Sequence, residues 1–121
     1  MFKKLECVCI HTDSIEKSLS FYTSMGLTEN WKIERILDDG FNWAIIGLKF
    51  PEKESSELVL SNHPKNKFTE VEILVEDVRQ VHRKLSKNDE IRWIRPPFAT
   101  ESGHVAVMEA PDGNVFVLVG K

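Results

Sequence analysis

The stretch HTDSIEKSLSFYTSMGL, residues 11–27, decides the fold because its plan occurs twice in the chain. A short apolar strand, Cys7 to Ile10, precedes it, and an acidic residue introduces the amphipathic helix within it. The same order returns in the second half, as the strand Val71 to Val75, then Asp77, then VRQVHRKL. Both halves end in further apolar strands, WAIIGLKF and ELVLSN in the first and HVAVMEA and VFVLVG in the second. An internal repeat of this kind predicts two similar half-modules that pack together.

Length and composition describe one ordinary domain. The 121 residues are 41% hydrophobic and 29% charged, which allows a single sizeable core. The formal net charge of −3 argues against a nucleic-acid partner, which would require a basic face. No apolar run approaches the roughly 18 residues of a membrane span. We therefore expect neither nucleic acid nor a membrane among the partners.

The cysteines indicate a reducing compartment. Cys7 and Cys9 lie on one predicted strand, where their side chains are parallel and poorly placed to form a disulfide. The opening residues MFKKLECV contain two lysines with no apolar stretch after them, so no secretory signal is visible. Two reduced thiols without a signal predict a cytoplasmic protein.

The first half has the pattern of one β-α-β-β-β module. Asp13 is expected to cap the helix, with Glu16 completing a capping box. Gly26 supplies a left-handed stop at the end of the helix. The turn Asp38-Asp39-Gly40 predicts a hairpin between two strands of alternating character. The strands after the helix are expected at 29–37, 41–49 and 58–61.

The second half repeats this plan after the polar segment NHPKNK. Asp77 is expected to cap its helix, Pro96-Pro97 to interrupt the strands, and Pro111 to Asn114 to form a tight turn. The strands are expected at 69–76, 90–95, 104–109 and 115–119. We predict a single domain over 1–121, with half-modules 1–62 and 67–121 and a linker at 63–66.

This order of elements resembles the vicinal oxygen chelate superfamily, which includes glyoxalase I, extradiol dioxygenases and bleomycin-resistance proteins. The local matches are an SxxFY stretch at Ser18, Phe21 and Tyr22, and the PDGN turn at Pro111 to Asn114. The resemblance covers essentially the whole chain. It implies an α+β fold of two tandem β-α-β-β-β modules forming a curved-sheet cleft, commonly completed in a homodimer.

Catalytic members of that superfamily hold a divalent metal with one side chain from the first and one from the last strand of each module. Two registers are open: counting from the caps pairs Glu6 with Glu70, whereas matching the buried faces pairs Cys7 with Glu70. We prefer the second, because a one-residue slip would turn the apolar face of the strand to the cleft. The last strands place the remaining positions at Val59 and Val117. Valine cannot bind a metal, so we expect no metal and no cofactor.

Carboxylates, histidines and tryptophans are the candidate ligand contacts. Glu70 and Glu72 lie opposite the apolar face of their strand and could accept hydrogen bonds from a cationic ligand, or form an ordinary solvated face. Trp31 and Trp93 occupy the second strand of each module, and would suit a flat aromatic ligand or fill the core. The predicted ligand-binding residues are Cys7, Cys9, His11, Trp43, Val59, Glu70, Glu72, Trp93, His104 and Val117.

Three functions are compatible with this pattern. The first is metal-independent binding of a small organic molecule, aromatic or cationic, in the cleft, as in bleomycin-resistance-like sequestration. The second is a glyoxalase-type lyase or dioxygenase whose metal ligands are unrecognised, with Glu6 or Glu57 turned inward. The third is a cofactor-free isomerase or hydrolase that uses a histidine of the cleft. Metal content separates the second from the others, and turnover separates the third from the first.

Overall fold

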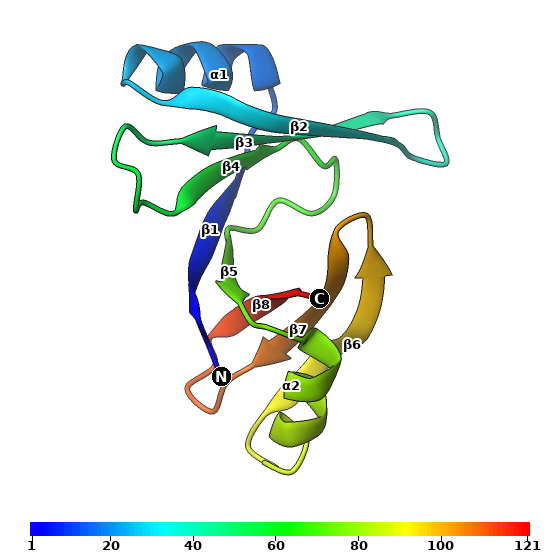
Figure 1. Ribbon diagram of the computed structural model, residues 1–121. Helices are drawn as coiled ribbons and strands as arrows, with labels where there is room; N and C mark the ends of the chain where they lie inside the picture. The colour runs from blue at the N-terminus through cyan, green and yellow to red at the C-terminus, as the bar shows by residue number, and fades with distance from the viewer. The chain divides into compact units, whose positions relative to one another are not determined.

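The computed structural model describes residues 1–121 and confirms the α+β class with two β-α-β-β-β repeats (Figure 1). The first repeat comprises β1 (Lys4–His11), α1 (Ile15–Ser24), β2 (Thr28–Ile36), β3 (Asn42–Lys49) and β4 (Glu57–Ser61). The second comprises β5 (Glu70–Leu74), α2 (Val78–Leu85), β6 (Arg92–Thr100), β7 (Gly103–Glu109) and β8 (Val115–Gly120). Hydrogen bonds connect the strands in the order β2-β3-β4-β1-β5-β8-β7-β6. Neither helix is long and apolar enough to cross a membrane.

The chain divides into two compact units. The N-terminal unit is Cys7–Thr69, and the C-terminal unit is Met1–Glu6 together with Glu70–Lys121. The first six residues thus group with the second repeat. One contact that links them to it is a backbone hydrogen bond, in which the Lys3 N–H donates to the Leu74 carbonyl at 2.8 Å.

In the N-terminal unit, α1 covers one face of the strands β2, β3, β4 and β1. Its apolar stripe packs on the core residues Leu27, Ile46, Leu48 and Leu60, and it is formed by Ile15, Leu19 and Tyr22, as expected. The helix is capped by Ser14, whose side chain accepts from the Lys17 N–H, so the predicted cap at Asp13 is wrong by one residue. Gly26 has a φ of 101° and ends the helix as predicted.

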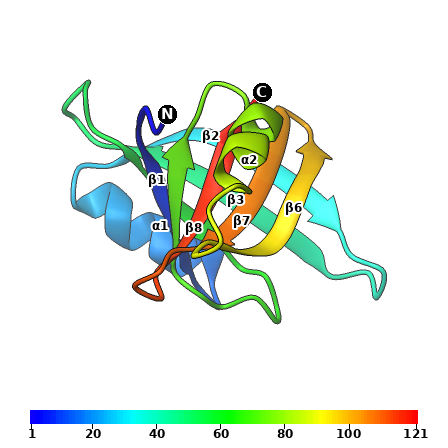
Figure 2. The same ribbon diagram turned by 90° about the horizontal axis from the view of Figure 1, so that it is seen from below.

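In the C-terminal unit, α2 lies against the strands β6, β7 and β8 (Figure 2). Val78 and Val81 of the helix are buried with Val75 and Leu118 of the sheet. The Asp77 side chain caps the helix as predicted, because it accepts from the Gln80 N–H at 3.1 Å. That hydrogen bond, the largest cause, lowers the pKa of the Asp77 carboxyl below its usual value.

The pair Pro96-Pro97 does not interrupt the strands, which corrects the expected end of a strand at residue 95. β6 continues through both prolines to Thr100. It lies at the edge of the sheet, where an N–H that faces away from the neighbouring strand makes no ladder hydrogen bond, and the two prolines fall at a break in the regular pairing with β7. The pairing with β7 shifts register twice, between Trp93 and Arg95 and between Arg95 and Phe98. These shifts change which face each side chain of β6 occupies.

Candidate functional site

The face of the N-terminal unit opposite α1 contains all five predicted ligand-binding residues of that half. Strand pairing aligns Cys9 with Val59, Val59 with Gly47, and Gly47 with Trp31, so these four residues form one row across the sheet. Paired residues point to the same side of a sheet, and alternate residues share a face. We call this surface the cysteine–tryptophan face. It consists of Cys7, Cys9, His11, Trp31, Ile33, Arg35, Trp43, Ile45, Gly47, Glu57, Val59 and Ser61.

The centre of the cysteine–tryptophan face is apolar. Cys7, Cys9 and Val59 are buried as one cluster, with Trp31 and Ile45 packed against it. Cys7 is only 3% exposed, which makes it a small buried hydrophobic residue rather than an accessible nucleophile.

Trp31 lies flat at one end of this cluster because its cross-strand neighbour is glycine. A Cβ atom at Gly47 would clash with Cε2, Nε1 and Cζ2 of the Trp31 indole, far within van der Waals contact. The indole Nε1–H donates to Oε1 of Glu57 at 2.8 Å, and the Asn30 amide donates to the other oxygen at 2.7 Å. One carboxylate therefore fixes the orientation of the tryptophan. This arrangement is not apparent from the sequence, although a glycine within a strand often marks close packing.

Trp43 is held at the other end of the face. Its Nε1–H donates to Oγ of Ser61 at 2.9 Å. The His63 ring meets it edge to face at 4.7 Å between centroids, and the Arg35 guanidinium lies 4.8 Å from the indole centroid. Three neighbours from different segments thus hold Trp43 in one position.

Hydrogen bonds determine the proton positions of two histidines beside Trp43. The His11 Nε2 lies 2.9 Å from the His63 carbonyl, and since a carbonyl only accepts, Nε2 carries the hydrogen. A neutral His11 consequently has its lone pair on Nδ1. The Nδ1 of His63 accepts the backbone N–H groups of Lys65 at 3.1 Å and Asn66 at 2.9 Å. His63 therefore organises the predicted linker.

The corresponding face of the C-terminal unit has charged ends. Glu72 pairs with Val117, Val117 with Val107, and Val107 with Arg95, which forms the equivalent row. Glu70 and Glu72 lie opposite the core residues Ile73 and Val75, as the sequence predicts. The Arg95 guanidinium lies 3.8 Å from the centroid of the Phe98 ring.

Trp93 and His104 lie on the other face of the C-terminal unit, contrary to their predicted place beside Glu72 and Val117. Trp93 packs against the core under α2, and the His82 ring of that helix meets it at 4.5 Å between centroids. His104 shares its face with buried Ala106 of the same core. The buried Nε1 of Trp93 and Nδ1 of His104 have no hydrogen-bond partner. Trp31 and Trp93 are therefore not equivalent, because Arg95 occupies the position that corresponds to Trp31.

The residues at the superfamily's metal-binding positions do not fit a metal ion. Val59 and Val117 offer no donor atom, and both are buried. Glu57, which the alternative reading would recruit, pairs in register with Cys7, but both of its oxygens already accept hydrogen bonds. Glu6 alternates with Cys7 and so belongs to the opposite face of β1. No three side chains of His, Cys, Asp or Glu form a group that could hold a metal.

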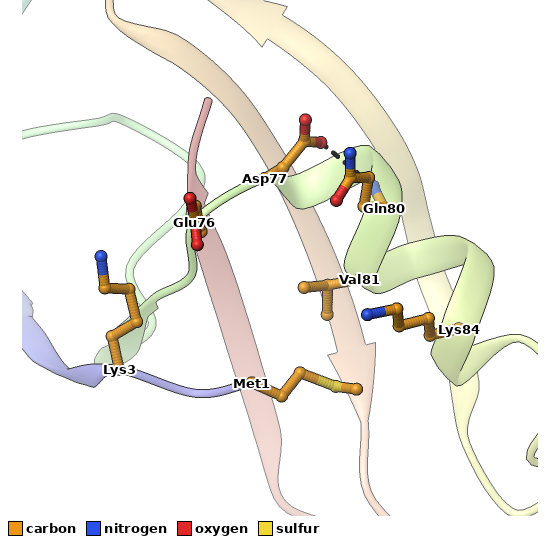
Figure 3. A pocket seen from close by; sticks show the side chains of 7 residues that line it. All are labelled: Met1, Lys3, Glu76, Asp77, Gln80, Val81 and Lys84. Carbon is orange, nitrogen blue, oxygen red and sulfur yellow. Dashed lines mark hydrogen bonds between the residues drawn. The ribbon is translucent and has the colours of Figure 1, made fainter.

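A pocket of about 360 Å³ lies in the C-terminal unit near the start of α2 (Figure 3). Its lining combines Lys3 and Lys84 with the carboxylates of Glu76 and Asp77. Asp77 is already engaged as the helix cap. The pocket carries charges of both signs, and one of its carboxylates already caps α2, so its lining favours no particular ligand. The cysteine–tryptophan face is therefore the better candidate for a binding site.

Comparison with known proteins supports the fold. No profile of a known protein family and no curated protein sequence matches the chain. Among solved structures, a hypothetical protein from Bacillus halodurans is similar over 98% of this chain and 94% of its own, with 19% identity and a TM-score of 0.73. Methylmalonyl-CoA epimerase from Mycobacterium tuberculosis is similar over 98% of this chain and 88% of its own, with 15% identity and a TM-score of 0.74.

A catechol 2,3-dioxygenase is also similar in structure. The match covers 96% of this chain but 42% of the dioxygenase, with 16% identity and a TM-score of 0.62. Together with the paired β-α-β-β-β repeats, these likenesses show that the chain has the vicinal oxygen chelate fold. Identities this low show the fold alone, so any ligand must be argued from the residues of this chain.

Proposed function

We propose that the cysteine–tryptophan face binds a small aromatic or amphipathic molecule without a metal ion. The observation that carries the proposal is that both indole N–H groups on this face are already used, Trp31 by Glu57 and Trp43 by Ser61. Each indole is thereby held in place, and each ring is only partly buried, so its remaining exposed surface can contact a ligand. Aromatic groups that are ordered before binding lose little conformational entropy when a ligand arrives.

The chemistry of the face favours a particular class of ligand. Trp31 packs against the apolar cluster of Cys7, Cys9 and Val59, and an apolar aromatic surface of this kind suits a flat hydrophobic group. Glu57 adds a negative charge at the Trp31 end. Each of its oxygens accepts one hydrogen bond and has a second lone pair, so the carboxylate can still accept from a cationic or amine group of a ligand. An aromatic compound with one basic substituent meets both conditions.

Reversible binding, as in bleomycin-resistance-like sequestration, requires no group beyond these. An isomerase or hydrolase that needs no cofactor would use the Nδ1 lone pair of His11, whose side chain is 13% exposed. The His11→Gln variant separates the two functions, since it removes this base while keeping a polar side chain. Sequestration predicts that ligand affinity changes little and that the ligand is recovered chemically unchanged.

A fluorescence screen tests the proposal. Protein treated with a chelator is titrated with a library of aromatic amines and neutral aromatic compounds, and the tryptophan emission is followed. We expect ligands whose affinity falls about tenfold in Trp43→Leu, because one ring contact is lost. The matched control is Trp93→Phe, which changes a tryptophan on the other unit's helix-covered face and should leave affinity unchanged. Binding that needs added metal, or that depends on Trp93 alone, would contradict the proposal.

A further inference from the structure

The two edges of the sheet differ in their capacity to pair with another strand. β6, at one edge, contains Pro96-Pro97 and two register shifts. Proline and irregular pairing are common protections against edge-to-edge association. β2, at the other edge, contains no proline. Its pairing with β3 has one register shift, between Glu29 and Trp31, and is regular from Trp31 to Ile36. The β2 edge is therefore geometrically able to accept a further strand.

The residues of this edge are complementary to themselves. The segment Trp31-Lys32-Ile33-Glu34-Arg35 has opposite charges on either side of a central isoleucine. If two copies run antiparallel about Ile33, Lys32 of each lies opposite Glu34 of the other. On the other face, Trp31 of each lies opposite Arg35 of the other, which brings a guanidinium beside an indole. Both kinds of cross-strand pair are favourable.

Neighbouring registers lack this complementarity. A continuous sheet requires paired residues to point to the same side, so the symmetric alternatives are centred on other single residues. Centring on Lys32 places two lysines opposite each other, and centring on Glu34 places two glutamates opposite each other. Like charges directly opposite are destabilising. Only the register centred on Ile33 places both Lys32 and Glu34 opposite a residue of opposite charge.

We propose that β2 pairs antiparallel with β2 of a second copy of this chain, with the two-fold axis at Ile33. In each chain Lys32 and Glu34 already form an ion pair at 2.9 Å along the strand, and their side chains are 45% and 46% exposed. Pairing with a second copy adds two symmetric ion pairs and continues the backbone ladder. It also places Arg35 of the partner subunit beside Trp31, so the interface and the cysteine–tryptophan face share a residue. The interface does not depend on the proposed ligand.

Charge exchange at the two positions tests the interface. The Lys32→Glu variant places glutamates opposite each other, and the Glu34→Lys variant places lysines opposite each other. We expect either variant to weaken the dimer about tenfold or more in sedimentation equilibrium, because each change acts twice by symmetry. Lys53→Glu, an equal charge change in the exposed loop before β4, is the matched control and should dimerise like the natural chain.

Mixing the two variants gives the sharper result. A Lys32→Glu chain and a Glu34→Lys chain are complementary, so a heterodimer should form although each chain has lost its own internal ion pair. The double variant with both changes should also regain dimerisation. A natural chain that stays monomeric at high concentration would overturn the proposal. So would single variants that dimerise like Lys53→Glu, or a mixture that forms no heterodimer.

Discussion

The two rows that cross the faces opposite the helices, Cys9-Val59-Gly47-Trp31 and Glu72-Val117-Val107-Arg95, occupy equivalent positions in the two units. Their third residues explain much of the difference. Glycine at 47 lets an indole lie flat on the strand, whereas valine at 107 already fills that space. The first row therefore ends in a tryptophan, Trp31, that is held in one orientation. The second row ends in charged residues, Glu72 and Arg95. The same backbone plan thus carries two different surfaces, because the glycine at position 47 leaves room for an indole ring.

The largest expected effect comes from filling the space at Gly47. The Gly47→Val variant should lower the free energy of unfolding by about 2–3 kcal/mol, because the indole of Trp31 must leave its place. Urea denaturation followed by circular dichroism measures this change. The double variant with Trp31→Ala should recover part of the loss, since the obstructing ring is gone. If Gly47→Val is as stable as the natural chain, the Trp31 indole does not need the space at position 47, and the explanation for the difference between the two rows is wrong.

A smaller effect is expected at the carboxylate that orients Trp31. Glu57→Ala leaves the indole N–H and the Asn30 amide without their acceptor, which should cost about 1–2 kcal/mol of unfolding free energy. Thermal unfolding measures the loss, and a change in tryptophan emission should accompany it. Glu57→Gln retains one acceptor oxygen and serves as the control. If Glu57→Ala and Glu57→Gln behave alike, the carboxylate does not fix the ring.

Sequence analysis could predict the elements because alternation and turn residues are local signals. The faces of Glu70 and Glu72 followed from the apolar residues between them, and the stop at Gly26 followed from its need for positive φ. The faces of Trp93 and His104 could not be found in this way. Two register shifts alter the alternation along β6, and both faces of β7 are apolar, so neither strand shows which side is covered.

The contacts that order the tryptophans were beyond sequence analysis for a different reason. Trp31 and Glu57 are far apart in the chain and meet only because β3 lies between β2 and β4. The local cap at Ser14 was misassigned to Asp13, since adjacent serine and aspartate residues are both good capping residues. Long-range pairing and the choice between adjacent caps both need the folded structure.

The helix caps of the two units should differ in their dependence on pH. Asp77→Ala should lower the unfolding temperature by a few degrees at neutral pH, because the Gln80 N–H loses its acceptor. The pKa of Asp77 is lowered in the folded state, so its contribution is present above the usual pKa and is lost as the pH falls through the lowered value.

Ser14→Ala is the matched change in the N-terminal unit, where the cap is a neutral hydroxyl. Its cost should not vary with pH. Melting curves for both variants between neutral and acidic pH make the comparison. A cost for Asp77→Ala that persists undiminished in acid would contradict the charged-cap account.

Removing metal ions should have no effect at all. The valines at 59 and 117 cannot bind a metal, so dialysis against a chelator should leave the unfolding temperature unchanged, and elemental analysis should find no stoichiometric metal per chain. About one bound metal per chain, lost in Glu70→Gln, would mean that Glu70 binds a metal ion and would contradict this expectation.

The most direct test of the proposed binding face is nuclear magnetic resonance of the three indole N–H groups. Single Trp→Phe variants assign the signals of Trp31, Trp43 and Trp93, and a ligand from the fluorescence screen is then titrated into the chelator-treated protein. The account predicts that the signals of Trp31 and Trp43 shift together with ligand concentration while the signal of Trp93, under α2, stays in place. A shift confined to Trp93, or none at Trp31 and Trp43, would contradict it.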